Sequence, residues 1–268
     1  MSTAVHSGSD LKISPWQQWL EHPEKTRIRR PIFQFHLWAG MLAGAYVFVM
    51  SVSGSLIVFR NQLEASSDSP LFTVIEWFVR LHENLLSGMM GRSVNGIGGL
   101  SLTLLCVTGV IVWWPGIIHW RRSLTVQWNA SLARINWDLH NALGFWCLVF
   151  VLLWAVSGVY FAFPNPFNAV VDFLQRPGAT ARIRSGDLVL QWLSNLHFGR
   201  FNVFTEVLWS VLGLVPAIVS FTGAFMCCHR IFVRKGGRSL GSCGSETTIR
   251  GTVAPHAAPS VPTSLRPF

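Results

Sequence analysis

Charged side chains are scarce in this sequence of 268 residues, where Asp, Glu, Lys and Arg make up 12% of the chain. Soluble globular proteins carry about 25%, and half of this chain is hydrophobic, so the composition excludes an ordinary soluble domain. Negatively charged residues are rarer than positively charged ones, with 12 Asp and Glu against 21 Lys and Arg, and the net charge is +9. Since the basic residues lie between long uncharged runs, their pattern indicates membrane topology rather than nucleic-acid binding.

Cysteine is also scarce, and its spacing excludes two kinds of cofactor site. The five cysteines lie in apolar runs or near the C-terminus: Cys106, Cys147, Cys227, Cys228 and Cys243. Because no Cys-x-x-Cys and no Cys-x-x-Cys-His occurs, the sequence supports neither a zinc ribbon nor covalently attached c-type haem. A dinucleotide-binding glycine fingerprint and a hydrolytic triad motif are absent as well, so hydride transfer and hydrolysis have no visible apparatus.

Four stretches without Asp, Glu, Lys or Arg are long enough to cross a bilayer, which takes about 20 apolar residues in a helix. They are Ile32–Phe59, Ser93–Trp120, Leu139–Phe163 and Val207–His229. The sequence therefore predicts an all-α integral membrane protein with four transmembrane helices. Amphipathic patterns at about 69–87 and at Leu188–Leu196 predict short helices that lie on the membrane interface.

The distribution of Lys and Arg predicts the orientation of the four helices. Fourteen of these residues precede the first span, separate the second from the third, or follow the fourth, and seven lie in the other two connections. Because cytoplasmic segments carry the excess of positive charge, we expect a multi-pass protein with both termini in the cytoplasm. Segments 60–92 and 164–206 are then expected on the outer face.

An internal repeat links the two halves of the chain. The pattern H-x3-G-x12-S-G begins at His36 and again at His140, and both later spans carry Gly-Leu, seven residues and Thr-Gly. Copies that both begin and end inside are parallel repeats, and we expect their matched small residues to allow close helix packing. The predicted parts are a cytoplasmic segment 1–31, a two-helix repeat 32–120, a cytoplasmic connection 121–138, a second two-helix repeat 139–232 and a disordered cytoplasmic tail 233–268.

Four histidines follow the repeat. His36 and His140 each open a span, while His82 and His197 each follow a leucine ahead of a Thr-Gly span. Pseudo-symmetry places His36 opposite His140 on the cytoplasmic side and His82 opposite His197 on the outer side. Since a low-spin b-type haem takes two neutral imidazoles on opposite faces of its ring, the sequence predicts two haem b groups with these four residues as iron ligands.

Cations near the spans are candidates for pairing with haem propionates, because guanidinium groups bind carboxylates strongly. Arg92 and Arg200 are the residues that we assign to this role. The tryptophan-rich surroundings of the spans are suited to packing a porphyrin, and they are equally typical of an interfacial belt in a protein without any cofactor.

Several segments together resemble the PepSY-associated transmembrane helix family over about residues 30–235. They are Phe35-His36-Leu-Trp-Ala-Gly40, Leu81-His82-Glu-Asn-Leu-Leu86, Gly91-Arg92, Trp113-Trp114-Pro115, Asp138-Leu139-His140 and Leu196-His197-Phe-Gly199. The resemblance implies an iron-regulated protein of the bacterial inner membrane, similar to haem-containing ferric-siderophore reductases, with His36, His82, His140 and His197 as its membrane histidines. The segment from Phe59 to Gly91 is too short for the soluble PepSY domain that such proteins commonly carry there.

The leading interpretation is an electron conduit across the bilayer. Two haem b groups would pass electrons from a separate donor, a quinol or a cytoplasmic reductase, to an external iron chelate or partner protein. An alternative of a different class is a non-redox scaffold or accessory subunit whose histidines only form hydrogen bonds or sense pH. A metal transporter is a third possibility, and the lack of carboxylates in the predicted spans argues against it.

Overall fold

The computed structural model describes residues 14–23, 26–64, 70–117, 120–174 and 185–242. Within these ranges the secondary structure is helical and contains no strand. The elements are α1 (Pro15–Glu21), α2 (Arg29–Ile57), α3 (Arg60–Glu64), α4 (Pro70–Asn84), α5 (Gly88–Trp113), the 3-10 helix η2 (Trp120–Leu124), α6 (Leu132–Trp146), α7 (Leu148–Ala162), α8 (Pro164–Leu174), α9 (Ser185–Phe198), α10 (Val203–Gly213) and α11 (Val215–Ser242). The predicted all-α architecture is confirmed for the described residues.

Three helical segments are long and apolar enough to cross a membrane: Arg29–Gln62, Gly88–Trp113 and Val203–Ile231. The pair α6 and α7 makes a fourth candidate if it forms one span, and its two helices are bent by 64°. The structure therefore contains three to four of the four predicted spans. The third span differs from the straight helix that its composition predicts, because α6 ends at Trp146 and α7 begins at Leu148.

Helix α6 also begins earlier than the apolar run predicts. The run without charge starts at Leu139, whereas α6 starts at Leu132, after an extended Ser131. Two charged side chains are accommodated in this first part, because Arg134 Nε lies 3.0 Å from the carboxylate of Asp138 one turn later. Since ion pairs at i and i+4 support a helix, charge ends the apolar pattern here without ending the helix.

The last span is interrupted between α10 and α11, next to Pro216. A proline lacks the backbone N–H that the helical ladder needs, and the hydroxyl of Ser51 on α2 enters the ladder at this point. Ser51 Oγ donates a hydrogen bond to the carbonyl of Gly213 and accepts one of 3.0 Å from the N–H of Ala217. A side chain inserted in this way is an established cause of a helix break, and it ties α2 to the fourth span.

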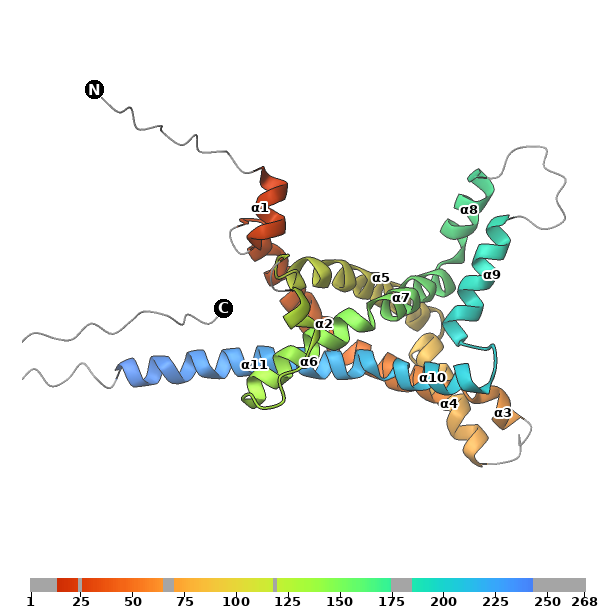
Figure 1. Ribbon diagram of the computed structural model, residues 1–268. Coiled ribbons are helices and arrows are strands. Elements are labelled where there is room, and N and C mark those ends of the chain that lie inside the picture. Colours follow the sequence, from red (N-terminus) through yellow and green to blue (C-terminus); the bar gives the residue numbers. More distant parts are fainter. Residues whose placement is uncertain (1–13, 24–25, 65–69, 118–119, 175–184, 243–268) are drawn as a thin grey trace, which may run out of the picture. The chain divides into compact units, whose positions relative to one another are not determined.

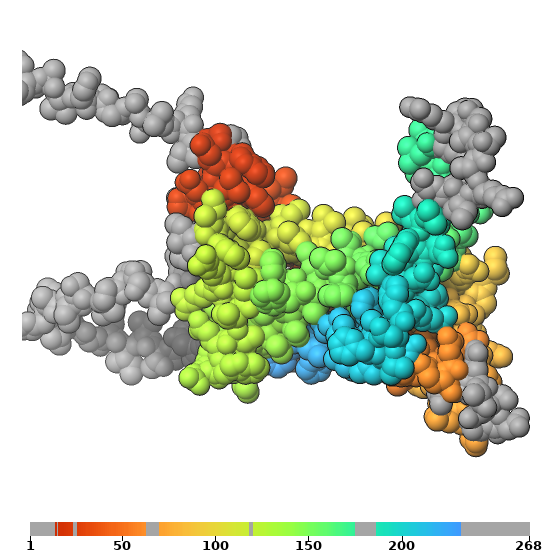
Figure 2. Space-filling view, turned by 45° about the vertical axis from the view of Figure 1, so that its right-hand side comes forward, coloured from red at the N-terminus to blue at the C-terminus, as the bar shows by residue number. Residues whose placement is uncertain are grey.

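Helix α5 packs against both α2 and α7, so it joins the two halves of the chain (Figure 1). Glycine permits one of these contacts, since a Cβ at Gly99 would lie 3.0 Å from the carbonyl oxygen of Ala155. Helix α4 covers α2 and α5, α9 lies on α7, and α10 lies on α2. Figure 2 shows α6, α7, α9 and α10 along one face of the molecule.

Helices α4 and α9 coincide with the two predicted amphipathic segments. In α4, Ile75 and Val79 are buried, while Leu71, Val74 and Trp77 are exposed. Their location on the membrane interface remains a prediction. Helix α11 continues to Ser242, so the first part of the predicted tail is helical, and residues 243–268 lie outside the described ranges.

Candidate functional site

His36 and His140 are held by matching contacts in the two halves of the chain. His36 on α2 places Nδ1 3.0 Å from the hydroxyl of Thr108 on α5. His140 on α6 places Nδ1 3.0 Å from the hydroxyl of Thr222 on α11. We call these two residues the first histidine pair. Each threonine belongs to the Thr-Gly of the sequence repeat.

The second histidine pair consists of His82 and His197, which are held by the same kind of contact. Here α2 and α7 supply the hydroxyls instead of α5 and α11. His82 at the end of α4 lies with Nδ1 3.0 Å from the hydroxyl of Ser53 on α2. His197 at the end of α9 lies with Nδ1 2.6 Å from the hydroxyl of Ser157 on α7. These serines are the ones in the repeated Ser-Gly, so all four histidines contact hydroxyls of their own half.

The hydrogen-bond pattern favours the tautomer with the proton on Nδ1 of each histidine. Each hydroxyl donates to a carbonyl of its own helix, for example Ser53 Oγ to Val49 O at 2.7 Å and Thr108 Oγ1 to Leu104 O at 2.8 Å. A hydroxyl has one hydrogen to donate, so its oxygen accepts the Nδ1–H of the histidine. His140 supports this assignment, because its Nδ1 also lies 3.1 Å from the carbonyl of Val219, which can only accept.

The glycines of the repeat have a different role from the expected helix packing. A Cβ at Gly54 would lie 2.9 Å from His82 Cε1, at Gly109 3.3 Å from His36 Cε1, and at Gly223 3.2 Å from His140 Cε1. Three of the four glycines thus make room for an imidazole rather than for a helix backbone. Gly158 is the exception among them, with no atom within 4 Å of its added Cβ.

The histidines also interact across the two halves, in the pairs that the repeat predicts. The members of each pair, His36 with His140 and His82 with His197, lie near enough to repel each other when both are protonated. Desolvation lowers the pKa of His82 to about 4, and desolvation together with the charge of His82 lowers the pKa of His197 to about 3. Both imidazoles of the second pair are therefore neutral at pH 7, the form that binds a metal ion.

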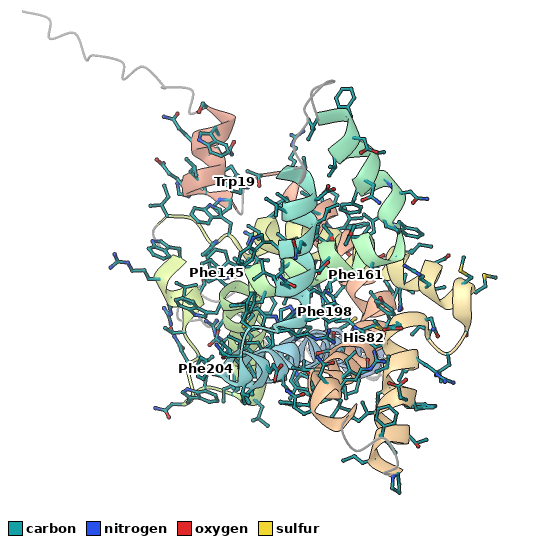
Figure 3. The ribbon with its side chains drawn as sticks, turned by 90° about the vertical axis from the view of Figure 1, so that its right-hand side faces the viewer. Trp19, His82, Phe145, Phe161, Phe198 and Phe204 are labelled. Carbon is teal, nitrogen blue, oxygen red and sulfur yellow. The ribbon has the colours of Figure 1, made fainter. Side chains whose placement is uncertain are left out.

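Both histidines of the second pair line a cavity of about 650 Å³. Its lining includes His82, His197, Arg92 and Arg200, the two arginines that the sequence predicts for propionate binding. Phe161 and Phe198, which Figure 3 labels together with His82, supply part of its apolar wall, and their ring centres lie 5.0 and 5.2 Å from that of His197. The volume is within the range of about 300–1,000 Å³ typical of small-molecule and cofactor sites.

Both arginines are oriented by contacts at the edge of this cavity. Arg92 donates from Nε to the carbonyl of Phe161 at 3.1 Å. Arg200 lies with its guanidinium carbon 4.4 Å from the ring centre of Phe198, a cation–π contact. Arg60, which the sequence analysis did not single out, also lines the cavity and pairs with Glu76 at 3.1 Å.

Aromatic side chains lie near the first histidine pair. Trp113 is one turn beyond Gly109 on α5, and its ring stacks on Phe145 of α6 at 4.6 Å between ring centres. The indole N–H groups of Trp113 and Trp114 are buried without a partner among the described residues. Because an indole nitrogen can only donate, these two groups suit a ligand that carries acceptor oxygens.

Within the described residues, no three His, Cys, Asp or Glu side chains gather in a way that could hold a metal ion. A tetrahedral zinc site, which uses three or four such ligands, has no counterpart in these ranges. The four histidines form two pairs, and two histidines are the ligand number that a low-spin haem takes from a protein.

The apolar helices define a multi-pass membrane protein. A family profile described as the PepSY-associated TM region matches residues 67–185, which include His82, Arg92 and His140. This segment is thus similar to the PepSY-associated TM family, as the sequence motifs indicate.

A relative in Pseudomonas aeruginosa, described as uncharacterized protein PA4219, is 32% identical over 87 residues. The similarity covers 31% of this chain and 21% of that protein. The chain therefore matches about a fifth of the length of this relative. No solved structure matches the chain.

Sequence reasoning missed the four hydroxyl residues as parts of the site. Ser53, Thr108, Ser157 and Thr222 were visible in the repeat, but small residues in apolar helices are ordinarily explained by helix packing. The signal that distinguishes them is their spacing relative to the histidines, repeated in both halves.

Proposed function

We propose that the protein binds two haem b groups and conducts single electrons across the bacterial inner membrane. The observation that carries this proposal is the second histidine pair, whose two imidazoles line one cavity together with two arginines. The chemistry that haem b supplies when bound is one-electron exchange between the ferric and ferrous states of its iron.

The residues of the second pair fit this cofactor in three respects. Their Nδ1 atoms are bonded to Ser53 and Ser157, so the Nε2 lone pairs are available for iron. Both histidines line the cavity, and its wall combines aromatic and aliphatic side chains with cations. Arg92 and Arg200 would bind the propionates, and the desolvated surroundings of the histidines keep them neutral.

The residues of the first pair fit in a similar way. His36 and His140 have the same Nδ1 contacts, and glycines on α5 and α11 leave space beside their rings. The buried indole N–H groups of Trp113 and Trp114 would donate to propionate oxygens. The two sites together would supply one electron-carrying centre near each face.

The repeat and the charge distribution complete the proposal. The matching contacts in each half support two parallel two-helix repeats, with both termini in the cytoplasm. Electrons would then enter from a quinol or a cytoplasmic reductase near the first pair. They would leave near the second pair to an external acceptor, for which the family resemblance favours ferric iron or a ferric chelate.

The visible spectrum of the detergent-purified protein, oxidised and dithionite-reduced, tests the cofactor. Low-spin b-type bands and a pyridine haemochrome value of two haems per chain are expected. An unchanged haem content in His140→Ala would remove that residue from the ligand set. Protein that stays colourless after expression with a haem precursor would overturn the proposal and favour the non-redox scaffold.

Electron transfer itself is tested in liposomes that contain the protein and an enclosed reductant. Chelated ferric iron added outside should be reduced, as measured with a ferrous-specific dye, and liposomes with His82→Ala protein should reduce it no faster than empty ones. Haem-loaded protein that fails to reduce external ferric chelates would leave a haem protein with another acceptor.

A further inference from the structure

We propose that Ser53, Thr108, Ser157 and Thr222 are positioning residues, each of which fixes one histidine with its Nε2 lone pair directed toward a metal ion. This inference rests on the proposed haem sites, because it explains how this chain prepares their ligands. It assigns a role to four hydroxyls that contact no cofactor themselves.

The first support is the direction of the hydrogen bonds. The hydroxyl hydrogen of Ser157 is directed to Leu153 O at 2.6 Å, and that of Ser53 to Val49 O at 2.7 Å. An oxygen that has donated its hydrogen can only accept from the imidazole. The protonated nitrogen is therefore Nδ1, and Nε2 keeps an unprotonated lone pair, which is the tautomer that binds a metal through Nε2.

The second support is the absence of a competing partner on the other side of each ring. Among the described residues, every hydrogen bond of the four imidazoles with an assigned ring atom uses Nδ1. A buried neutral imidazole with only one side satisfied suits an additional ligand at Nε2. For His82 and His197 the cavity provides the space in which such a ligand would lie.

The third support is the burial of the hydroxyls. Ser53 and Ser157 are exposed by 1% and 0%, and Thr222 by 3%. Alanine would fill these positions in an apolar helix without any polar atom, so close packing alone does not explain a hydroxyl. The hydroxyl adds an acceptor at the place where a histidine of the same half arrives.

The expected consequence is a stronger and better oriented ligand. A hydrogen bond at the second nitrogen fixes the ring plane and raises the basicity of the nitrogen that binds the metal. The hydroxyl is itself part of a chain from imidazole to helix carbonyl, and such chains polarise their members. Removing a contact of this kind typically weakens metal binding by about 10- to 100-fold.

Thr108 provides the sharpest experiment, because threonine has both an isosteric and a functional replacement. Thr108→Val keeps the shape and removes the hydroxyl, whereas Thr108→Ser keeps the hydroxyl. Thr103→Val is the matched control, since Thr103 lies on the same helix and bonds its own carbonyl, Gly99 O, at 2.9 Å without contacting a histidine. Haem retention is measured as the rate of transfer to an excess of an apoprotein acceptor, together with the electron paramagnetic resonance spectrum of the ferric protein.

We expect Thr108→Val to lose haem from one site about 10- to 100-fold faster and to shift its low-spin signal. Thr108→Ser and Thr103→Val should behave as the unchanged protein. If Thr108→Val resembles Thr103→Val in both readouts, the inference is overturned while the haem proposal stands. If the unchanged protein binds no haem, the proposed function itself fails, and this inference fails with it.

Ser157→Ala and Ser157→Thr repeat the test at the second pair, where the hydroxyl is on α7. These variants decide the question if Thr108→Val does not fold, that is, if it does not elute as a single species in detergent. Faster haem loss in Ser157→Ala, with normal retention in Ser157→Thr, supports the inference. Equal retention in both variants overturns it.

Discussion

The first and second histidine pairs are built by the same contacts in different surroundings. In the first pair, helices α2 and α6 carry the histidines and place them on threonines of α5 and α11. In the second pair, helices α4 and α9 carry the histidines and place them on serines of α2 and α7. Helix α2 thus supplies a histidine near its start and a hydroxyl near its end.

The surroundings differ in polarity. The second pair opens into the 650 Å³ cavity with Arg60, Arg92 and Arg200 in its lining. Near the first pair lie the stacked rings of Trp113 and Phe145 and the buried indole N–H groups, and Arg29 donates to the carbonyl of Val112 at 2.9 Å. The comparison teaches that the ligand geometry belongs to the repeat, while each environment would set the electronic properties of its own site.

Removal of one histidine gives the largest expected difference between the pairs. His197→Ala should lower the haem content from two to one per chain, because His82 alone cannot hold a low-spin haem. The remaining spectrum should be that of the first pair, and His36→Ala should leave the complementary spectrum. Pyridine haemochrome values and reduced-minus-oxidised spectra provide the measurement.

His229→Ala is the control for this comparison, since His229 stacks on Phe225 and belongs to neither pair. It should retain two haems. Loss of both haems in either single variant, His197→Ala or His36→Ala, would show that the two sites do not form independently.

A smaller effect is expected from the glycine beside His82. A Cβ at Gly54 would lie 2.9 Å from His82 Cε1, whereas a Cβ at Gly44 on the same helix meets nothing within 4 Å. Gly54→Ala should displace His82 and weaken haem binding at that site by about 10-fold, near the lower limit for disturbed metal-ligand support. Haem transfer rates of the two variants give the measurement.

Gly44→Ala is the matched control, because Gly44 lies on the same helix outside the cavity lining, and it should leave haem transfer unchanged. Because alanine is favoured over glycine in a helix by about 0.5–1 kcal/mol, its thermal stability should equal or exceed that of the parent. Identical haem transfer in both variants would contradict the close approach of His82 to α2.

Much of this architecture follows from the sequence, because its signals are long and periodic. The apolar runs identify α2, α5 and the last span, and the repeated His and Ser-Gly or Thr-Gly spacing identifies which residues correspond. The family segment 67–185 confirms the resemblance that the motifs carry. The pairs that interact electrostatically are the ones that pseudo-symmetry predicts.

The remaining features depend on tertiary contacts that leave no local signal. The break between α6 and α7 at Cys147 has no proline or glycine at that position, and Ser51 meets Gly213 from a distant helix. The early start of α6 is concealed because Arg134 and Asp138 neutralise each other only once the helix has formed. Likewise, the contacts of Ser53 and Thr108 depend on which histidine ring lies beside them in the fold, and spacing within one chain segment does not specify that partner.

The smallest expected effect concerns the cations that line the cavity of the second pair. Arg200→Gln removes a positive charge from the cavity lining and should lower the midpoint potential of one haem, because positive charge nearby favours the reduced, less positive iron. For a partly exposed charge worth roughly 0.5–1.4 kcal/mol, the shift is about 20–60 mV, since 59 mV is a tenfold change for one electron.

The potential of the other haem should not move in Arg200→Gln. Arg121→Gln is the control, because it removes a cation that lies over Trp120 outside the cavity lining, and it should move neither potential. A redox titration that resolves two components decides it, and an equal shift of both components in Arg200→Gln would place this charge equally close to both sites, contrary to its position in the structure.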